Sequence, residues 1–163
     1  MGNLSHIPQI KTLSEIRLAG IAMQMSLAQN STLLLWQRFM PFYKKQQIWA
    51  GKVLYSVEEY DAEYFTIFST QNTFTKWAVA PLKANAAVPK GLKELILPQG
   101  LYAIFTYKGK AASAGPMYHY IFTKWLPESG YQLDARPHFA LMGERYKNNS
   151  SESEEEIWVP VRG

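Results

Sequence analysis

The sequence predicts an α+β fold made of two fused βαββ repeats, with antiparallel sheets, pseudo-twofold symmetry and a ligand cleft between the halves. Several segments alternate apolar and polar residues with the period of a strand, and two others carry apolar residues at helical spacing. The order strand, helix, strand, strand occurs twice in 163 residues. We therefore expect one domain over residues 1–163, with repeat one at about 7–82, a linker at 83–91 and repeat two at about 92–163.

In each repeat, the first long strand is predicted from apolar residues that alternate with polar ones on both sides of a glycine. In repeat one the apolar positions switch from even to odd at Gly20, which predicts a bulge or kink there. Gly100 marks the matching point of repeat two, 100 − 20 = 80 residues later. The alternating residues are Ile16, Leu18, Ile21, Met23, Met25 and Leu27, then Leu95, Leu97, Leu101, Ala103, Phe105 and Tyr107.

A helix is expected after each of these strands. The first begins near Asn30-Ser31, whose side chains are good N-caps. It ends at Lys44-Lys45, whose charges suit the negative end of the helix dipole, and Pro41 should kink it or mark its last turn. The second helix opens within residues 113–116 and ends at Gly130.

Two further strands close each repeat. We expect them at about 52–60 and 64–82 in repeat one, and at about 131–146 and 154–161 in repeat two. The Asn-Asn-Ser-Ser run at 148–151 predicts a loop. Together with the helices, these strands complete two βαββ units of similar length.

Composition and motifs exclude several classes of protein. No cysteine is present, so there is no disulfide framework or thiolate nucleophile, and the +4 charge forms no basic block for nucleic acid. No run is apolar enough for a membrane span, and no signal peptide is evident, so we expect a cytoplasmic protein. His6, His119 and His138 show no metal-site spacing. Without a complete catalytic motif or a cofactor motif, we expect a binding protein with no cofactor, as a monomer or weak dimer.

The last strand carries the one local feature that points to chemistry. Its aliphatic residues Ile157, Val159 and Val161 alternate onto one face. If that face packs on the helices, Glu156 and Trp158 point into the cleft between the halves. A carboxylate beside an indole in a partly dry cavity can hold an organic cation. Composition alone favours the alternative, that residues 152–156 form a solvated acidic turn.

Trp77 is a candidate counterpart in the first repeat. Matching Pro81 with Pro160 places Trp77 opposite Glu156 in the duplication. One half would then present an indole where the other presents a carboxylate, which predicts an asymmetric pocket. A slip of one residue in this match would turn Trp77 into the core.

Six short segments, in this order and spacing, carry a family resemblance. They are residues 35–40 (LWQRFM), 55–60 (YSVEEY), 74–78 (FTKWA), 97–103 (LPQGLYA), 125–131 (WLPESGY) and 156–161 (EIWVPV). Through them the chain resembles the GyrI-like domain, also called the AraC-type effector-binding domain, from about Ile7 to its end. The closing segment is the most telling of the six.

The resemblance implies two fused βαββ modules around a ligand cleft that takes hydrophobic, often cationic compounds, commonly in the sensing part of a transcription regulator. It also implies that the cleft glutamate is Glu156, with Trp77, Tyr102 and Trp158 as candidate aromatic walls. We expect a stand-alone member without a DNA-binding segment. Leu101 departs from the small or polar residue that many relatives carry there.

Three functions stay open at this point. The first is a sensor or sink for a hydrophobic, cationic small molecule. The second is a hydrolase of strained electrophilic natural products, with Glu156 as the base that activates water. The third is a protein-interaction module that inhibits an enzyme such as DNA gyrase, a topoisomerase. The first two use the same residues, so the sequence alone does not separate them.

Overall fold

The computed structural model describes residues 7–110, 114–142 and 151–163. Its strands are β1 (Gln9–Leu13), β2 (Ile16–Ser26), β3 (Leu54–Glu59), β4 (Thr73–Pro81), β5 (Lys93–Leu97), β6 (Gly100–Lys108), β7 (Gln132–Leu133), β8 (His138–Met142) and β9 (Glu154–Arg162). Its helices are α1 (Thr32–Lys45), α2 (Gly115–Tyr120), the π-helix η2 (Ile121–Trp125) and α3 (Leu126–Ser129). The α+β class predicted from the sequence is confirmed.

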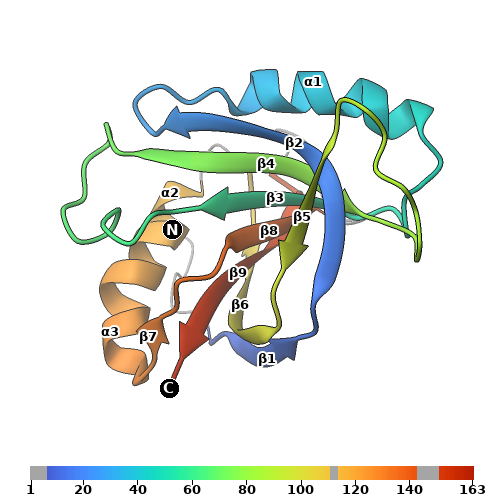
Figure 1. The fold of residues 1–163 in the computed structure, drawn as a ribbon. Coiled ribbons are helices and arrows are strands. Elements are labelled where there is room, and N and C mark those ends of the chain that lie inside the picture. The colour runs from blue at the N-terminus through green and yellow to red at the C-terminus, as the bar shows by residue number, and fades with distance from the viewer. Residues whose placement is uncertain (1–6, 111–113, 143–150) are drawn as a thin grey trace.

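The strands form one antiparallel sheet in the order β1-β6-β9-β8-β3-β4-β2-β5, with β7 paired to β9 (Figure 1). The pairing of β3 with β8 joins a first half (β2, β3, β4 and α1) to a second half (β6, β8, β9 and the later helices). Each edge strand comes from the other part of the chain, because β1 pairs with β6 and β5 pairs with β2. The two halves are therefore interlocked through both edges and the middle of the sheet.

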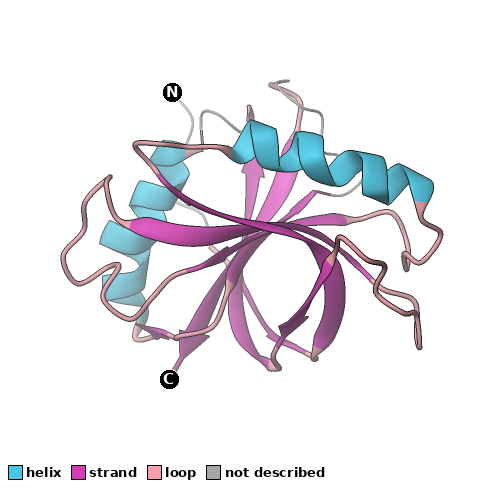
Figure 2. Cartoon of the chain, turned by 45° about the horizontal axis from the view of Figure 1, so that its top comes forward, coloured by secondary structure: helices cyan, strands magenta, loops and turns pink. Residues whose placement is uncertain are grey.

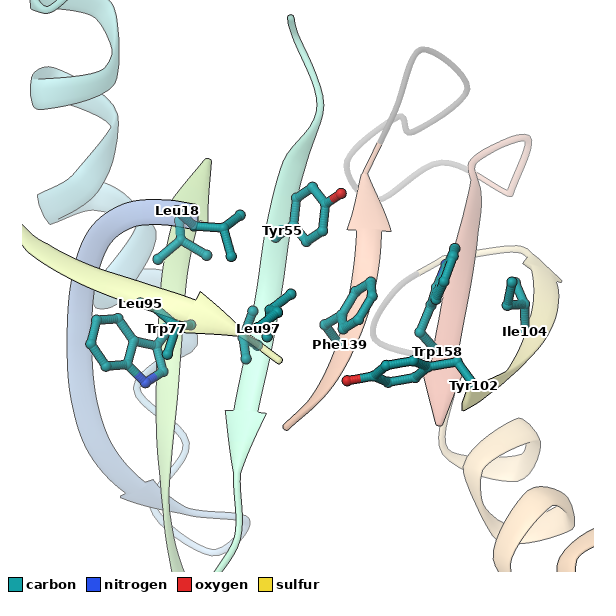
Figure 3. Close-up of a cluster of buried hydrophobic side chains, with 11 residues drawn as sticks. Leu18, Tyr55, Trp77, Leu95, Leu97, Tyr102, Ile104, Phe139 and Trp158 are labelled. Atoms are coloured by element: carbon teal, nitrogen blue, oxygen red, sulfur yellow. The ribbon is translucent and has the colours of Figure 1, made fainter. Parts of the chain in front are cut away.

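The sheet has two different faces. On the helix face, α1 covers β2 and β4, while α2 and η2 cover β6 and β9 (Figure 2). On the opposite face, which we call the inner face, the sheet curls so that side chains from both of its ends meet in one apolar cluster. Leu95 and Leu97 of β5 share this cluster with Tyr102 of β6 (Figure 3). The burial of apolar area on both faces stabilises the curl.

The helix boundaries follow the predicted signals. Ser31 is the N-cap residue of α1 without a side-chain capping bond, and the backbone N–H of Thr32 donates to Asn30 Oδ1 over 2.9 Å in the turn before the helix. Pro41 stays inside the last turns of α1, and Lys44-Lys45 form its basic end. Gly130 ends α3 with a left-handed φ of 81°. The π-helix between α2 and α3 was not indicated by the helical spacing of the apolar residues.

Two predicted strands differ in the structure. The strand expected at 64–82 begins only at Thr73, because residues 61–72 form turns held by side-chain bonds such as that from Asn72 Nδ2 to Ile67 O. The strand expected at 131–146 is divided into β7 and β8 by a corner at residues 134–137, and its predicted end at 143–146 lies outside the described residues. Most of the predicted 148–151 loop lies outside the described residues.

The sequence predicts a bulge or kink at Gly20; a bulge is absent there, because β2 pairs with β4 without interruption from Leu18 to Ser26. The switch in apolar parity has another cause. Before Gly20, Ile16 and Leu18 pack into the inner cluster, whereas after it Ile21 lies under α1. Gly20 itself is required by close approach, since a Cβ there would lie 1.9 Å from the Ala78 carbonyl oxygen.

Gly20→Ala should destabilise the fold by about 2–4 kcal/mol, because the added methyl group forces β2 away from β4. Urea unfolding measures the change. Gly115→Ala is the control, since a Cβ at Gly115 meets nothing within 4 Å, and its effect should stay within about 0.5 kcal/mol. A Gly20→Ala protein as stable as its parent would contradict the close contact of β2 with β4.

Candidate functional site

A small pocket, with a cavity volume of about 10 Å³, lies where β3 and β8 join the two halves. Both halves line it: Glu58 and Tyr60 come from the first, and Tyr118, Phe122 and His138 from the second. The backbone alternation of β3 sends Tyr55 and Val57 to the inner face, which leaves Glu58 on the helix face. The pocket thus lies on the helix face, in the interval between α1 and α2.

Glu58 supplies the pocket with a carboxylate in an environment that disfavours charge. The residue is half-buried, but its Oε2 atom is out of contact with solvent and accepts no hydrogen bond. Burial raises the pKa of Glu58 from 4.5 to about 7; the Lys76 charge opposes this shift and the Glu155 charge adds to it. A buried acceptor without a partner costs free energy, so a bound positive charge at Oε2 would be stabilising.

Two tyrosine hydroxyls share the pocket with Glu58. Burial first, and then the negative charge of Glu58, hold the pKa values of Tyr60 and Tyr118 well above their ordinary value of 10.0. Both side chains are therefore neutral at physiological pH. They offer the faces of aromatic rings and neutral O–H groups, and no competing positive charge.

His138 lies across from Glu58 in the β3–β8 register and is surrounded by aromatic rings. Its ring centroid is 4.9 Å from that of Tyr60, 5.8 Å from that of Phe65 and 5.9 Å from that of Phe122. Burial, with a contribution from the Arg136 charge, lowers the pKa of His138 to about 3. The imidazole is neutral and acts as one more aromatic wall.

Lys76 and Glu155 complete the charges around the pocket. Lys76 of β4 is the register partner of Glu58, and Glu155 lies on the helix face of β9, two residues from Ile157. Burial raises the pKa of Glu155 and the Lys76 charge lowers it. One lysine therefore interacts electrostatically with both carboxylates.

Glu156, which the sequence singled out, lies on the opposite face of the sheet. It is exposed, and its Oε1 accepts a hydrogen bond of 3.1 Å from Trp158 Nε1. The aliphatic face of β9 does pack on the helices, as predicted, but that is also the face that reaches the pocket. Trp158 touches both regions: it lines the pocket, and its ring stacks on Phe139 in the inner cluster at 5.0 Å (Figure 3).

Trp77 lies in the inner cluster, and its indole N–H donates to Glu59. Counted from the first residues of β4 and β9, which are 154 − 73 = 81 residues apart, Trp77 takes the place of Trp158 and not that of Glu156. The match of Trp77 with Glu156 stays a prediction. The two indoles lie in one cross-strand row, in which Val57 and Phe139 stand between them.

Tyr102 is enclosed in the inner cluster with no exposed surface. Its hydroxyl donates to the Pro137 carbonyl over 2.8 Å, and the Arg136 guanidinium carbon lies 4.7 Å from its ring centroid. Arg136 in turn donates to the carbonyls of Leu101 and Val161. These contacts make Tyr102 part of the corner before β8 and leave it away from the pocket.

Other kinds of site find no support among residues 7–110, 114–142 and 151–163. Within them, no group of three or more acidic or histidine side chains is placed to hold a metal ion. In the same part of the chain, no helix combines the length and the apolar character that crossing a bilayer requires. The pocket around Glu58 is accordingly the site that we consider further.

Glu58→Gln should raise the free energy of unfolding at about pH 8 and leave it nearly unchanged at about pH 4. Because the folded-state pKa is raised from 4.5 to about 7, the wild-type fold loses stability as the pH rises through this range. Each pH unit between the two values corresponds to about 1.4 kcal/mol, so the gain approaches about 3 kcal/mol. Urea unfolding at both pH values measures it. Glu128→Gln, at an exposed position of α3, is the control. An unchanged pH profile in Glu58→Gln would contradict the burial of this carboxyl.

The fold recurs in known structures. SAV2435 bound to tetraphenylphosphonium shares 18% identity, covers 96% of this chain and 94% of its own, and has a TM-score of 0.73. The EcmrR C-terminal domain shares 16% identity with coverages of 94% and 96% and a TM-score of 0.68. A hydrolase encoded by lin2189 from Listeria innocua shares 10% identity with coverages of 95% and 91% and a TM-score of 0.61.

At these identities the structures show a common fold. Among curated proteins, none matches the chain by sequence. The family described as the GyrI-like small molecule binding domain matches residues 6–162, which is nearly the whole length. The chain therefore belongs to the GyrI-like small molecule binding domain family.

Proposed function

We propose that this protein binds a lipophilic organic cation in the pocket between β3 and β8, with the Glu58 carboxylate as its counter-charge. The observation that carries the proposal is the buried, unpartnered Oε2 of Glu58 among aromatic side chains. Charge attraction is strong where water is excluded, and aromatic faces add cation–π attraction. A strongly hydrated cation would not recover its hydration there, so the pocket favours poorly hydrated, apolar cations.

The family supports this proposal, because SAV2435 has been solved with the lipophilic cation tetraphenylphosphonium. EcmrR, whose C-terminal domain has this fold, also forms a complex with DNA. By analogy, we propose that this chain serves as the effector-binding sensor of a regulatory system. Ligand binding would affect both halves of the protein through the β3–β8 junction, since both halves line the pocket.

The size of the pocket bears on the ligand. The enclosed space is only about 10 Å³, close to what one water molecule requires. Drug-sized ligands occupy pockets of roughly 300–1,000 Å³, so an aromatic cation must displace part of the lining. Phe122, from η2, lines the pocket, and Phe65, from the 61–72 turns, packs on it with 5.2 Å between ring centroids. Because these two rings come from separate elements, their separation would open the pocket.

Glu58→Gln should weaken binding of tetraphenylphosphonium by about 10- to 100-fold, since a charged interaction with a buried partner contributes about 1.5–3 kcal/mol. Isothermal titration calorimetry at about pH 8 measures the affinity. Glu156→Gln is the matched control and should bind within about twofold of wild type, because its exposed carboxylate is screened by solvent. The reverse ranking of the two variants would place the cation on the inner face instead.

A second candidate function is hydrolysis, and the state of Glu58 favours it. A carboxyl with a pKa of about 7 is suited to act as a general base near neutral pH, and neutral tyrosine hydroxyls stand beside it. The lin2189 neighbour is described as a hydrolase. Styrene oxide is a suitable strained electrophile. Diol formation above background that is lost in Glu58→Gln and kept in Glu156→Gln would establish turnover, and its absence would leave the binding function.

A further inference from the structure

Resting on the proposed function, we propose that the pocket is built to hold one positive charge, for which a proton and an organic monocation compete. Where Glu58 is protonated before binding, each monocation that binds releases one proton from it to solvent. The pocket also discriminates against dications, because Lys76 already supplies the second positive charge. These properties follow from counting the charged groups around Glu58.

Titratable groups face Glu58 from each described element packed against it. The neutral ones are Tyr60 at the end of β3, Tyr64 in the 61–72 turns, Tyr118 on α2 and His138 on β8. The charged ones are Lys76 on β4 and Glu155 on β9. Among residues 7–110, 114–142 and 151–163, the electrostatic balance of the site therefore depends on two carboxyl groups and one ammonium group.

This set is one positive charge short of neutrality. With Glu58 and Glu155 ionised and Lys76 protonated, the sum is −1 − 1 + 1 = −1. A net charge in a desolvated region is unfavourable, so the site acquires a further positive charge. The acceptor left without a partner is Oε2 of Glu58, which makes Glu58 the group that takes up the proton. The raised pKa of Glu58, about 7, agrees with this assignment.

The exchange balances in atoms and charge. The neutral carboxylic acid of Glu58 loses its proton to water, and the resulting carboxylate contacts the monocation, so that the site remains neutral. A dication would leave the site at +1. A desolvated site disfavours this uncompensated positive charge. Neutrality would then require that Lys76 leave the site or lose its proton. A single charge on the ligand is thus the best match.

The exchange makes cation affinity depend on pH in one direction. Below the Glu58 pKa of about 7, affinity for a fixed cation falls about tenfold for each pH unit, because a proton must be expelled. Above it, affinity is constant. Between about pH 8 and about pH 5, the dissociation constant of tetraphenylphosphonium should rise on the order of 100-fold. Triphenylphosphine oxide, which is neutral, expels no proton and should not show this dependence.

Calorimetric titration of the whole chain with tetraphenylphosphonium tests the exchange directly. Performed at several pH values in two buffers of different ionisation enthalpy, it gives both affinity and proton release. We expect release of close to one proton at about pH 5 and almost none at about pH 9. Glu58→Gln should bind more weakly, with no pH dependence and no release. Glu156→Gln should behave as wild type.

The outcomes separate the inference from the proposed function. Tetraphenylphosphonium binding that is independent of pH and releases no proton would overturn the exchange while the binding function stands. Release that persists in Glu58→Gln would also overturn it. Failure of tetraphenylphosphonium and of smaller cations to bind at any pH would overturn the binding function itself.

The charge count is tested with a matched pair of small probes at about pH 8. Benzyltrimethylammonium carries one charge, and p-xylylenebis(trimethylammonium) carries two on a similar frame. Wild type should prefer the monocation, and Lys76→Met, which leaves the site two charges short, should shift the preference toward the dication by about tenfold or more. Lys76→Arg and Lys93→Met, the latter on the exposed edge strand β5, should retain the wild-type preference. A wild type that binds the dication at least as tightly would overturn the count.

Discussion

The arrangement of the site depends on one constraint, which is that a carboxylate is buried at the joint between two halves of a sheet without a partner for Oε2. The desolvation of this group raises its pKa and disfavours its charge in the empty pocket. The same desolvation strengthens its attraction for a cation that enters. Lys76 limits the cost without removing it, because it is shared with Glu155. The proposed affinity for cations and its proposed dependence on protons thus have a single physical origin.

The curl of the sheet decides which face carries this site. On the inner face, both ends of the sheet converge on one apolar cluster, in which Val57 and Tyr102 have no exposed surface. On the helix face, α1 and α2 cover different halves and leave the middle to aromatic side chains from separate elements. The interlocked edge strands hold the two halves together on either side of this gap, in which we propose that the ligand binds.

Local patterns predicted the parts of the fold that local physics determines. The alternation of β9, the turn at Asn30 before α1 and the stop at Gly130 each depend on a few neighbouring residues. The face that carries the pocket depends on the curl and on helix spacing, which are long-range properties. Adjacent glutamates made it harder to predict which carboxylate faces the pocket. Each of two strands carries a pair of them, and the two members of a pair point to opposite faces: Glu58 and Glu59 on β3, and Glu155 and Glu156 on β9. The match of Trp77 with Glu156 depends on how the two repeats align, which local patterns do not determine.

The protonation state of the Glu58 carboxyl tests the account most directly. Infrared difference spectroscopy can follow it while tetraphenylphosphonium is added at about pH 6, where the empty pocket holds Glu58 largely protonated. The account predicts that a protonated-carboxyl band disappears and a carboxylate band grows, and that Glu58→Gln lacks this change while Glu156→Gln keeps it. A spectrum in which cation binding leaves the carboxyl bands unaltered, or in which the change is lost with Glu156 instead, would contradict the central role of Glu58.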